Sequence, residues 1–181
     1  MITEYEENID SDFEGTIFDI ETIGDFDRFY KYDSRQYKYF IQTILGYLDH
    51  KHLHIYCAKN MQGAKELKEV TRSLIESAES PFYAFNCNFE SGVWFHSIGL
   101  KVQFDGELQR WNYESKREAV KSLGIPNYDD PFFDDGFKCI EAWSGEDYDK
   151  AIAHNRACLL KERDILLNRG HREPNILEFV K

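Results

Sequence analysis

The chain has 181 residues and carries 33 acidic against 22 basic side chains, which gives a net charge of -11. Its length suits one hydrophobic core, and a hydrophobic content of 42% is enough to fill it, so a disordered chain is not expected. The acidity argues against tight nucleic-acid binding through a basic surface alone, although an acidic enzyme can hold phosphate through carboxylate-bound metal ions.

Targeting signals and redox motifs are missing from the sequence. No apolar run approaches the roughly 20 residues that cross a bilayer, and the acidic N-terminus does not have the layout of a signal peptide. The four cysteines are widely spaced and form no CxxC pair. We therefore expect a cytoplasmic protein with reduced thiols and no membrane partner.

Hydrophobic periodicity predicts the order of the elements. Residues 1–13 are expected to form a flexible acidic tail, and residues 14–181 a single domain. Strands are predicted at 15–21, 37–48, 53–58, 82–85 and 102–108, and helices at 61–76, 89–98, 114–123 and 147–168, with an acidic loop at 127–136. This order predicts an α/β domain whose first three strands form a meander.

Asp19 and Glu21 lie two residues apart in an apolar strand, so their side chains point to the same face. Two neighbouring carboxylates there would repel each other and lose hydration unless a cation lay between them. A divalent metal ion bound between the two carboxylates would remove their repulsion and replace their lost hydration, because Mg²⁺ prefers carboxylate oxygen. The alternative is a strand edge at which both carboxylates are hydrated.

Two later segments carry further polar groups. Glu90 follows the short apolar strand at 82–85 and opens a helix, which places it at an end of the sheet, where ligands bind in α/β folds. His154, Cys158 and Glu162 are spaced by four and share one flank of the last helix. The alternative for Glu90 is a carboxylate that is favoured by the helix dipole, and the alternative for the last helix is an ordinary polar flank.

These three segments resemble the motifs of DEDD-type 3′–5′ exonucleases of the ribonuclease-H-like superfamily. The first motif is Phe18-Asp19-Ile20-Glu21-Thr22, and the second is Asn86-Cys87-Asn88-Phe89-Glu90, with Glu where the family has Asp. The third motif is His154-Asn155-Arg156-Ala157-Cys158. The resemblance spans about residues 14–168 and implies a mixed sheet, in which an antiparallel three-strand meander is joined by parallel strands and flanked by helices.

The resemblance also implies a function. The chain would be a nuclease that hydrolyses DNA or RNA with two Mg²⁺ or Mn²⁺ ions and releases nucleotides from 3′ ends. The implied metal ligands are Asp19, Glu21 and Glu90, the implied general base is His154, and the implied substrate contacts are Asn86 and Phe89.

Cys158 departs from the family, which has a metal-binding carboxylate at this position, and a thiol is a poor ligand for Mg²⁺. Three interpretations remain open. Glu162 supplies the last carboxylate, or an acidic loop residue (Asp129, Asp130, Asp134 or Asp135) does, or the second ion is weakly held. In the third case, the chain is a catalytically impaired module that binds nucleic acid or a protein partner.

Two other clusters have simpler interpretations. The alternating His50, His52 and His54 suit a metal site, but a solvated hairpin edge explains them better. Lys116, Arg117 and Lys121 suit phosphate contacts, but a solvated helix face explains them better. A hydrolase for small phosphorylated molecules ranks last, because no glycine-rich phosphate loop is present.

Overall fold

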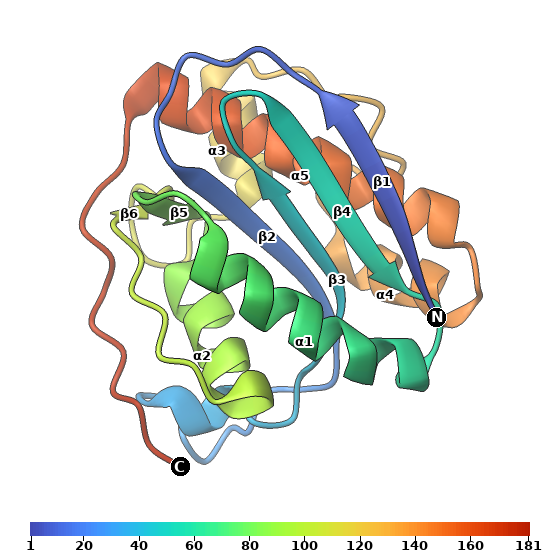
Figure 1. The fold of residues 1–181 in the computed structure, drawn as a ribbon. Helices are drawn as coiled ribbons and strands as arrows, with labels where there is room; N and C mark the ends of the chain where they lie inside the picture. The colour runs from blue at the N-terminus through green and yellow to red at the C-terminus, as the bar shows by residue number, and fades with distance from the viewer.

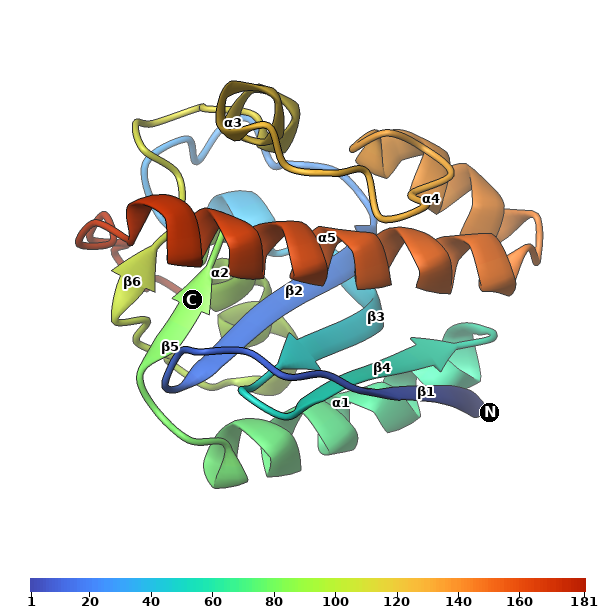
Figure 2. The same ribbon diagram turned by 90° about the horizontal axis from the view of Figure 1, so that it is seen from above.

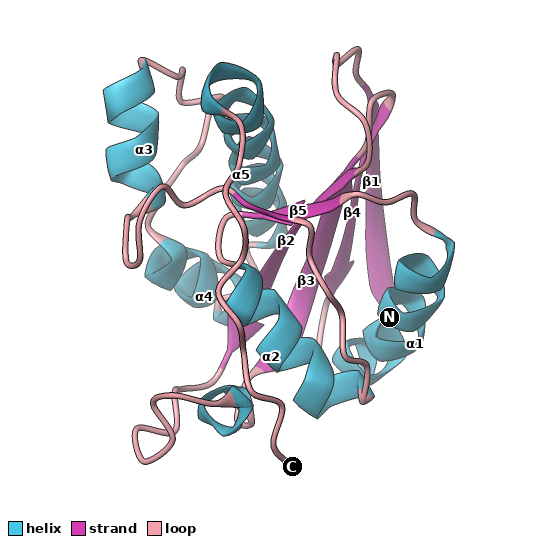
Figure 3. Cartoon of the chain, turned by 90° about the vertical axis from the view of Figure 1, so that its left-hand side faces the viewer, coloured by secondary structure: helices cyan, strands magenta, loops and turns pink.

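The computed structural model describes residues 1–181, with six strands in one sheet and five helices packed on its two faces (Figures 1 and 2). Helices α1 and α2 cover one face, and α3, α4 and α5 gather on the other (Figure 3). No helix is both long and apolar enough to span a membrane.

The sheet is mixed, as predicted. Its strands are β1 (Ile2–Asn8), β2 (Thr16–Ile23), β3 (Ile41–Leu48), β4 (His52–Ala58), β5 (Phe82–Ala84) and β6 (Gly106–Glu107). They lie in the order β1-β4-β3-β2-β5-β6. Strands β2, β3 and β4 form the predicted antiparallel meander, while β5 pairs in parallel with both β2 and β6.

The N-terminal residues correct one prediction, because the expected flexible tail contains a strand. All seven residues of β1 pair antiparallel with β4, from Ile2 opposite Ala58 to Asn8 opposite His52. Glu4 and Glu6 are exposed, while Tyr5 between them packs against the core. Two of the strand's three glutamates thus lie on the solvent-facing side of an edge strand, where charge discourages pairing with another chain.

The helices are α1 (Met61–Ser77), α2 (Cys87–Ile98), α3 (Lys116–Leu123), α4 (Gly136–Ser144) and α5 (Tyr148–Arg169), together with a 3₁₀ turn at Ser34–Tyr37. Helix α4 was not predicted, since the acidic segment before it was interpreted as a loop. Strand β6 is shorter than the predicted 102–108, and Val102 and Phe104 fill the core from irregular backbone instead.

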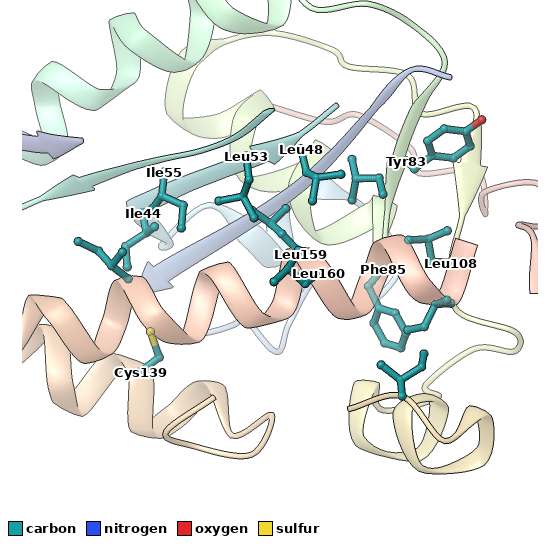
Figure 4. Packing of buried hydrophobic residues seen from close by; sticks show 14 of the residues in the cluster. Ile44, Leu48, Leu53, Ile55, Tyr83, Phe85, Leu108, Cys139, Leu159 and Leu160 are labelled. Carbon is teal, nitrogen blue, oxygen red and sulfur yellow. The ribbon is translucent and has the colours of Figure 1, made fainter. Parts of the chain in front are cut away.

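Alternation along β2 divides its side chains between two cores. Phe18 and Ile20 point towards α1 and α2, where Trp94 is fully buried. Ile17 points towards α5 and joins a second core that includes Leu159. Figure 4 shows Leu159 of α5 in this core together with Leu48 and Leu53 of the sheet. Because alternate residues share a face, Asp19 and Glu21 point towards α5, as Ile17 does.

Candidate metal centre

Asp19 is held directly against α5. Asn155 donates from Nδ2 to Asp19 Oδ2 at 2.7 Å and to the carbonyl oxygen of Asp19 at 3.2 Å. Gly46 of β3 lies opposite Asp19, and a Cβ on it would come within 2.1 Å of Asn155 Oδ1. The glycine is therefore what lets α5 approach the sheet closely enough for this contact.

The predicted flank of α5 faces the carboxylates of β2. His154 Nε2 lies 3.6 Å from Glu21 Oε1 and 3.7 Å from Cys158 Sγ. One turn further along, Glu162 is fully buried. The structure thus brings Asp19, Glu21, His154, Cys158 and Glu162 into one cluster.

Lys116 belongs to this cluster, although sequence reasoning assigned it to a solvated face. Its Nζ lies 2.8 Å from Asp19 Oδ1 and donates a hydrogen bond to it. It also lies 2.6 Å from Glu162 Oε1, an ion pair without hydrogen-bond geometry. Burial alone would lower the pKa of Lys116, but the charges of Asp19 and Glu162 raise it well above the ordinary value, so the ammonium is a fixed cation.

Glu90 approaches the same cluster from the first turn of α2. It is buried, and its Oε2 has no hydrogen-bond partner. Burial raises the pKa of Glu90 well above its usual value, and the nearby charges of Asp19 and Glu162 raise it further. Burial likewise raises the pKa of Glu162, with Asp19 adding to the effect and Lys116 opposing it. The cluster therefore holds more carboxylate than its own cations neutralise.

His154 is oriented by a second carboxylate. Its Nδ1 lies 2.8 Å from Asp130 Oδ1, and Asp130 is in turn bound by Lys161 Nζ at 2.8 Å. Burial by itself would lower the pKa of His154, but Cys158, Asp130 and Glu21 together raise it to about 12. A ring with so high a pKa is protonated near neutral pH, so the predicted general base holds its proton.

Glu21 is the other strongly perturbed carboxyl group. Burial raises the pKa of Glu21 to about 7, an increase that His154 and Lys116 oppose and Asp19 reinforces. Near neutral pH this carboxyl group is thus poised between its two protonation states.

The predicted substrate contacts lie beside Glu90. Asn86 is exposed at the start of α2 and makes no side-chain capping bond. Phe89 is half-buried and packs edge-on against Phe40 and Tyr37, with ring centroids 5.1 and 5.8 Å apart, and tilted against Phe26 at 6.2 Å. Because Phe26 is 51% exposed, this aromatic cluster reaches the surface.

The remaining candidate clusters do not assemble into a site. His54 stacks on Tyr47, and His52 lies 3.7 Å from Asp49. The predicted hairpin edge is wrong for these two residues, because β4 pairs with β1 as well as β3 and both histidines are partly buried. A cavity of about 580 Å³ lies elsewhere, lined by the start of α2, residues 101–105 and the C-terminal segment 173–179.

Two overlapping groups of donor atoms suit a metal ion. Ligand atoms of Asp19, Glu21 and Cys158 lie within 4.8 Å of one another, and so do those of Glu21, Cys139 and His154. The unpartnered oxygens of Glu90 and Glu162 add buried acceptors near these groups. A divalent cation fits this arrangement, since it would compensate several buried carboxylates at once.

Comparison of the chain with protein-family models, curated proteins and solved structures finds no match. The function must therefore be inferred from the geometry and chemistry of the chain's own residues.

Proposed function

We propose that the chain is a metal-dependent nuclease of ribonuclease-H-like fold, with 3′–5′ exonucleolytic hydrolysis of DNA or RNA as its reaction. One observation carries the proposal. Carboxylates from β2, the start of α2 and α5, which are far apart in the sequence, converge around Asp19 and remain under-neutralised. Such convergence suits the cleavage of phosphodiesters through bound metal ions.

Asp19, Glu21 and Glu90 would hold two Mg²⁺ or Mn²⁺ ions, with Glu162 supplying the carboxylate that Cys158 does not. These ions, when bound, would activate a water molecule and stabilise the departing 3′ oxygen. Lys116 would remain as a fixed positive charge beside the phosphate. Asn155 keeps the Asp19 carboxylate in place through its 2.7 Å hydrogen bond.

His154 is the general base in this proposal, so its ring must be oriented and must be able to lose its proton. Its Nδ1 is hydrogen-bonded to Asp130, which fixes the ring and leaves Nε2 towards Glu21. A general base must lose its proton before it can accept one, and a cation near Glu21 would lower the high pKa of His154.

The aromatic cluster of Phe26, Tyr37, Phe40 and Phe89 offers a surface for a nucleobase. Phe26 presents an exposed ring beside Phe89, and Phe89 directly precedes Glu90 in the sequence. Stacking on such rings tolerates any base, which suits an enzyme that removes nucleotides one after another.

The test is hydrolysis of 3′-labelled single-stranded DNA and RNA with Mn²⁺ or Mg²⁺. We expect metal-dependent release of nucleotides by the wild-type protein and its loss in Asp19→Asn. The matched control is Asp149→Asn, which changes an exposed carboxylate of α5 and should leave cleavage intact. No cleavage with either metal, or equal cleavage by wild type and Asp19→Asn, would refute the proposal.

Cys158 and Lys116 favour one second candidate function, a catalytically impaired module that binds nucleic acid or a protein partner. The thiol replaces an expected oxygen ligand, and the lysine already pairs with two of the carboxylates. Calorimetric titration with Mn²⁺ separates the two functions. Binding that disappears in Asp19→Asn supports the enzyme, and no binding to the wild-type protein supports the module.

A further inference from the structure

The donors at the candidate centre divide into two chemically different sides. Asp19, Glu90 and Glu162 offer only oxygen, and Lys116 lies among them. The other side, which we name the sulfur cluster, consists of Glu21, Cys139, His154 and Cys158. All four side chains are at least largely buried, and they come from β2, α4 and α5.

The spacing within the sulfur cluster matches a tetrahedral ion. With metal–sulfur and metal–nitrogen bonds of about 2.3 and 2.0–2.1 Å, a sulfur and a nitrogen ligand lie about 3.6 Å apart. Cys158 Sγ and His154 Nε2 are separated by 3.7 Å. His154 Nε2 and Glu21 Oε1 are separated by 3.6 Å, and a ligand atom of Cys139 lies within 4.8 Å of both Glu21 and His154.

The surroundings of His154 match those of a metal-binding histidine. Such a ring donates its second N–H to a carboxylate, which fixes the tautomer and orients the ligating nitrogen. Asp130 occupies that position at 2.8 Å from Nδ1, and the fully buried Lys161 holds Asp130 in place. Nε2 is thereby directed towards Glu21 and Cys158.

We propose that Glu21, Cys139, His154 and Cys158 bind one transition-metal ion of the zinc class. Two sulfurs and an imidazole are ligands that Zn²⁺ accepts and that Mg²⁺ and Ca²⁺ avoid. Each ligating thiol releases its proton to solvent when the ion binds. The site shares Glu21 and His154 with the proposed nuclease centre, so an ion bound here would occupy the Nε2 atom that the nuclease proposal uses as general base. Its binding does not depend on hydrolysis, because the ion would bind whether or not the protein cleaves a phosphodiester.

Binding would also join three separate elements. Cys139 lies on α4, which follows the acidic loop, and the ion would link this helix to β2 and α5. A ligand that binds the folded state alone stabilises it by mass action. The zinc-loaded protein should therefore unfold at a higher temperature than the metal-free protein.

Cobalt substitution tests the site without an activity assay. Metal-free protein titrated with Co²⁺ should bind one equivalent and develop thiolate-to-cobalt charge-transfer absorption with the visible bands of a tetrahedral ion, and Zn²⁺ should abolish both. Cys139→Ala and Cys158→Ala should each weaken the charge-transfer band. Cys57→Ala is the matched control, because Cys57 is equally buried but lies in β4. Asp130→Asn should weaken binding about 10–100-fold while leaving the band shape unchanged.

Zinc-edge X-ray absorption of the wild-type protein makes the test independent of whether the variants fold. We expect two sulfur and two nitrogen or oxygen ligands. A spectrum without sulfur, or a cobalt band that survives in both cysteine variants, would overturn the site. If no zinc site is found but Mn²⁺-dependent cleavage is intact, the nuclease proposal stands. If the zinc site is found but there is no cleavage, only the nuclease proposal is refuted.

Discussion

Lys116 Nζ lies 2.8 Å from Asp19 Oδ1, a contact that joins the third helix to the second strand across 97 positions of sequence. The same ammonium lies 2.6 Å from Glu162 of α5, so one cation serves two buried carboxylates. A divalent ion that entered between Asp19 and Glu162 would compete with this lysine for both partners.

Replacing Lys116 by Met should destabilise the protein by about 3 kcal/mol, because it leaves buried carboxylates without their cation. Mn²⁺ should then restore stability, since it can supply the missing charge. Thermal unfolding with and without Mn²⁺ measures both effects. We expect a larger Mn²⁺-induced rise in Tm for Lys116→Met than for the wild type, whereas Lys121→Met, on the exposed part of α3, should behave as the wild type does. A variant of full stability that ignores Mn²⁺ would contradict this view of Lys116.

Replacing Gly46 by Ala should impair the candidate centre from the neighbouring strand. The added Cβ would lie 2.1 Å from Asn155 Oδ1 and 2.8 Å from Leu159 Cδ1, so α5 must shift away from the sheet. Overpacking of this kind costs about 1–3 kcal/mol. Urea unfolding measures the loss of stability, and Mn²⁺ titration should show weaker binding because Asn155 no longer holds Asp19. Gly136→Ala, where an added Cβ meets open space, is the control that should change neither measurement.

Replacing Cys158 by Asp should change the preferred metal. A carboxylate at this position adds a hard oxygen ligand, so cleavage supported by Mg²⁺ should rise on the order of tenfold while the cobalt–thiolate band weakens. Nuclease assays with Mg²⁺ and with Zn²⁺ in parallel give the ratio of Mg²⁺-supported to Zn²⁺-supported cleavage. If that ratio is unchanged in Cys158→Asp, the thiol does not face the metal position.

The ion pair between Glu7 and Arg156 should make the docking of β1 depend on pH. Arg156 donates to Glu7 at 2.5 and 2.9 Å, and these bonds hold the pKa of Glu7 below its usual value although burial opposes them. A carboxyl group with a lowered folded-state pKa contributes stability above its unfolded pKa and loses it as the pH falls through the folded value. Glu7→Gln should therefore cost about 1 kcal/mol at pH 7, since the pair is partly exposed.

Urea unfolding at pH 7 and at the lowest pH that preserves the fold measures how the stabilisation by Glu7 changes with pH. The cost of Glu7→Gln should shrink at the acidic end. Glu4→Gln, on the exposed side of the same strand, should cost little at either pH. An unchanged cost at both pH values would mean that the Glu7 charge does not contribute.

Sequence periodicity was sufficient to predict the elements whose apolar residues follow a clear strand or helix spacing. Ile17, Phe18, Asp19 and Ile20 predicted a buried strand with both carboxylates on one face, and the apolar residues of 147–168 predicted the long helix. Periodicity failed at β1, where three glutamates concealed an alternating strand, and at α4, a helix of nine residues that directly follows the acidic loop.

The carboxylates and the histidine that gather at the candidate centre were predictable from the sequence, but the cations that pair with them were not. Spacing and element order pointed to Asp19, Glu90 and His154, and they made Glu162 one of three open interpretations for the last carboxylate. Lys116 could not be found this way, because a lysine in a polar helix has the same pattern whether its ammonium faces water or reaches buried carboxylates. Cys139 was likewise an isolated thiol until α4 placed it beside Glu21.

The spacing of His154, Cys158 and Glu162 along α5 has a consequence for the protein while it is being synthesised. Everything before residue 148 can leave the ribosome with Asp19, Glu21 and Glu90 in place but without any of these three partners. Because domains fold as their last elements emerge, the centre cannot assemble until α5 is complete. A nascent chain, or one truncated before α5, should thus be unable to bind its ion or act on a substrate, so metal binding would report that α5 has been made and has docked on the sheet.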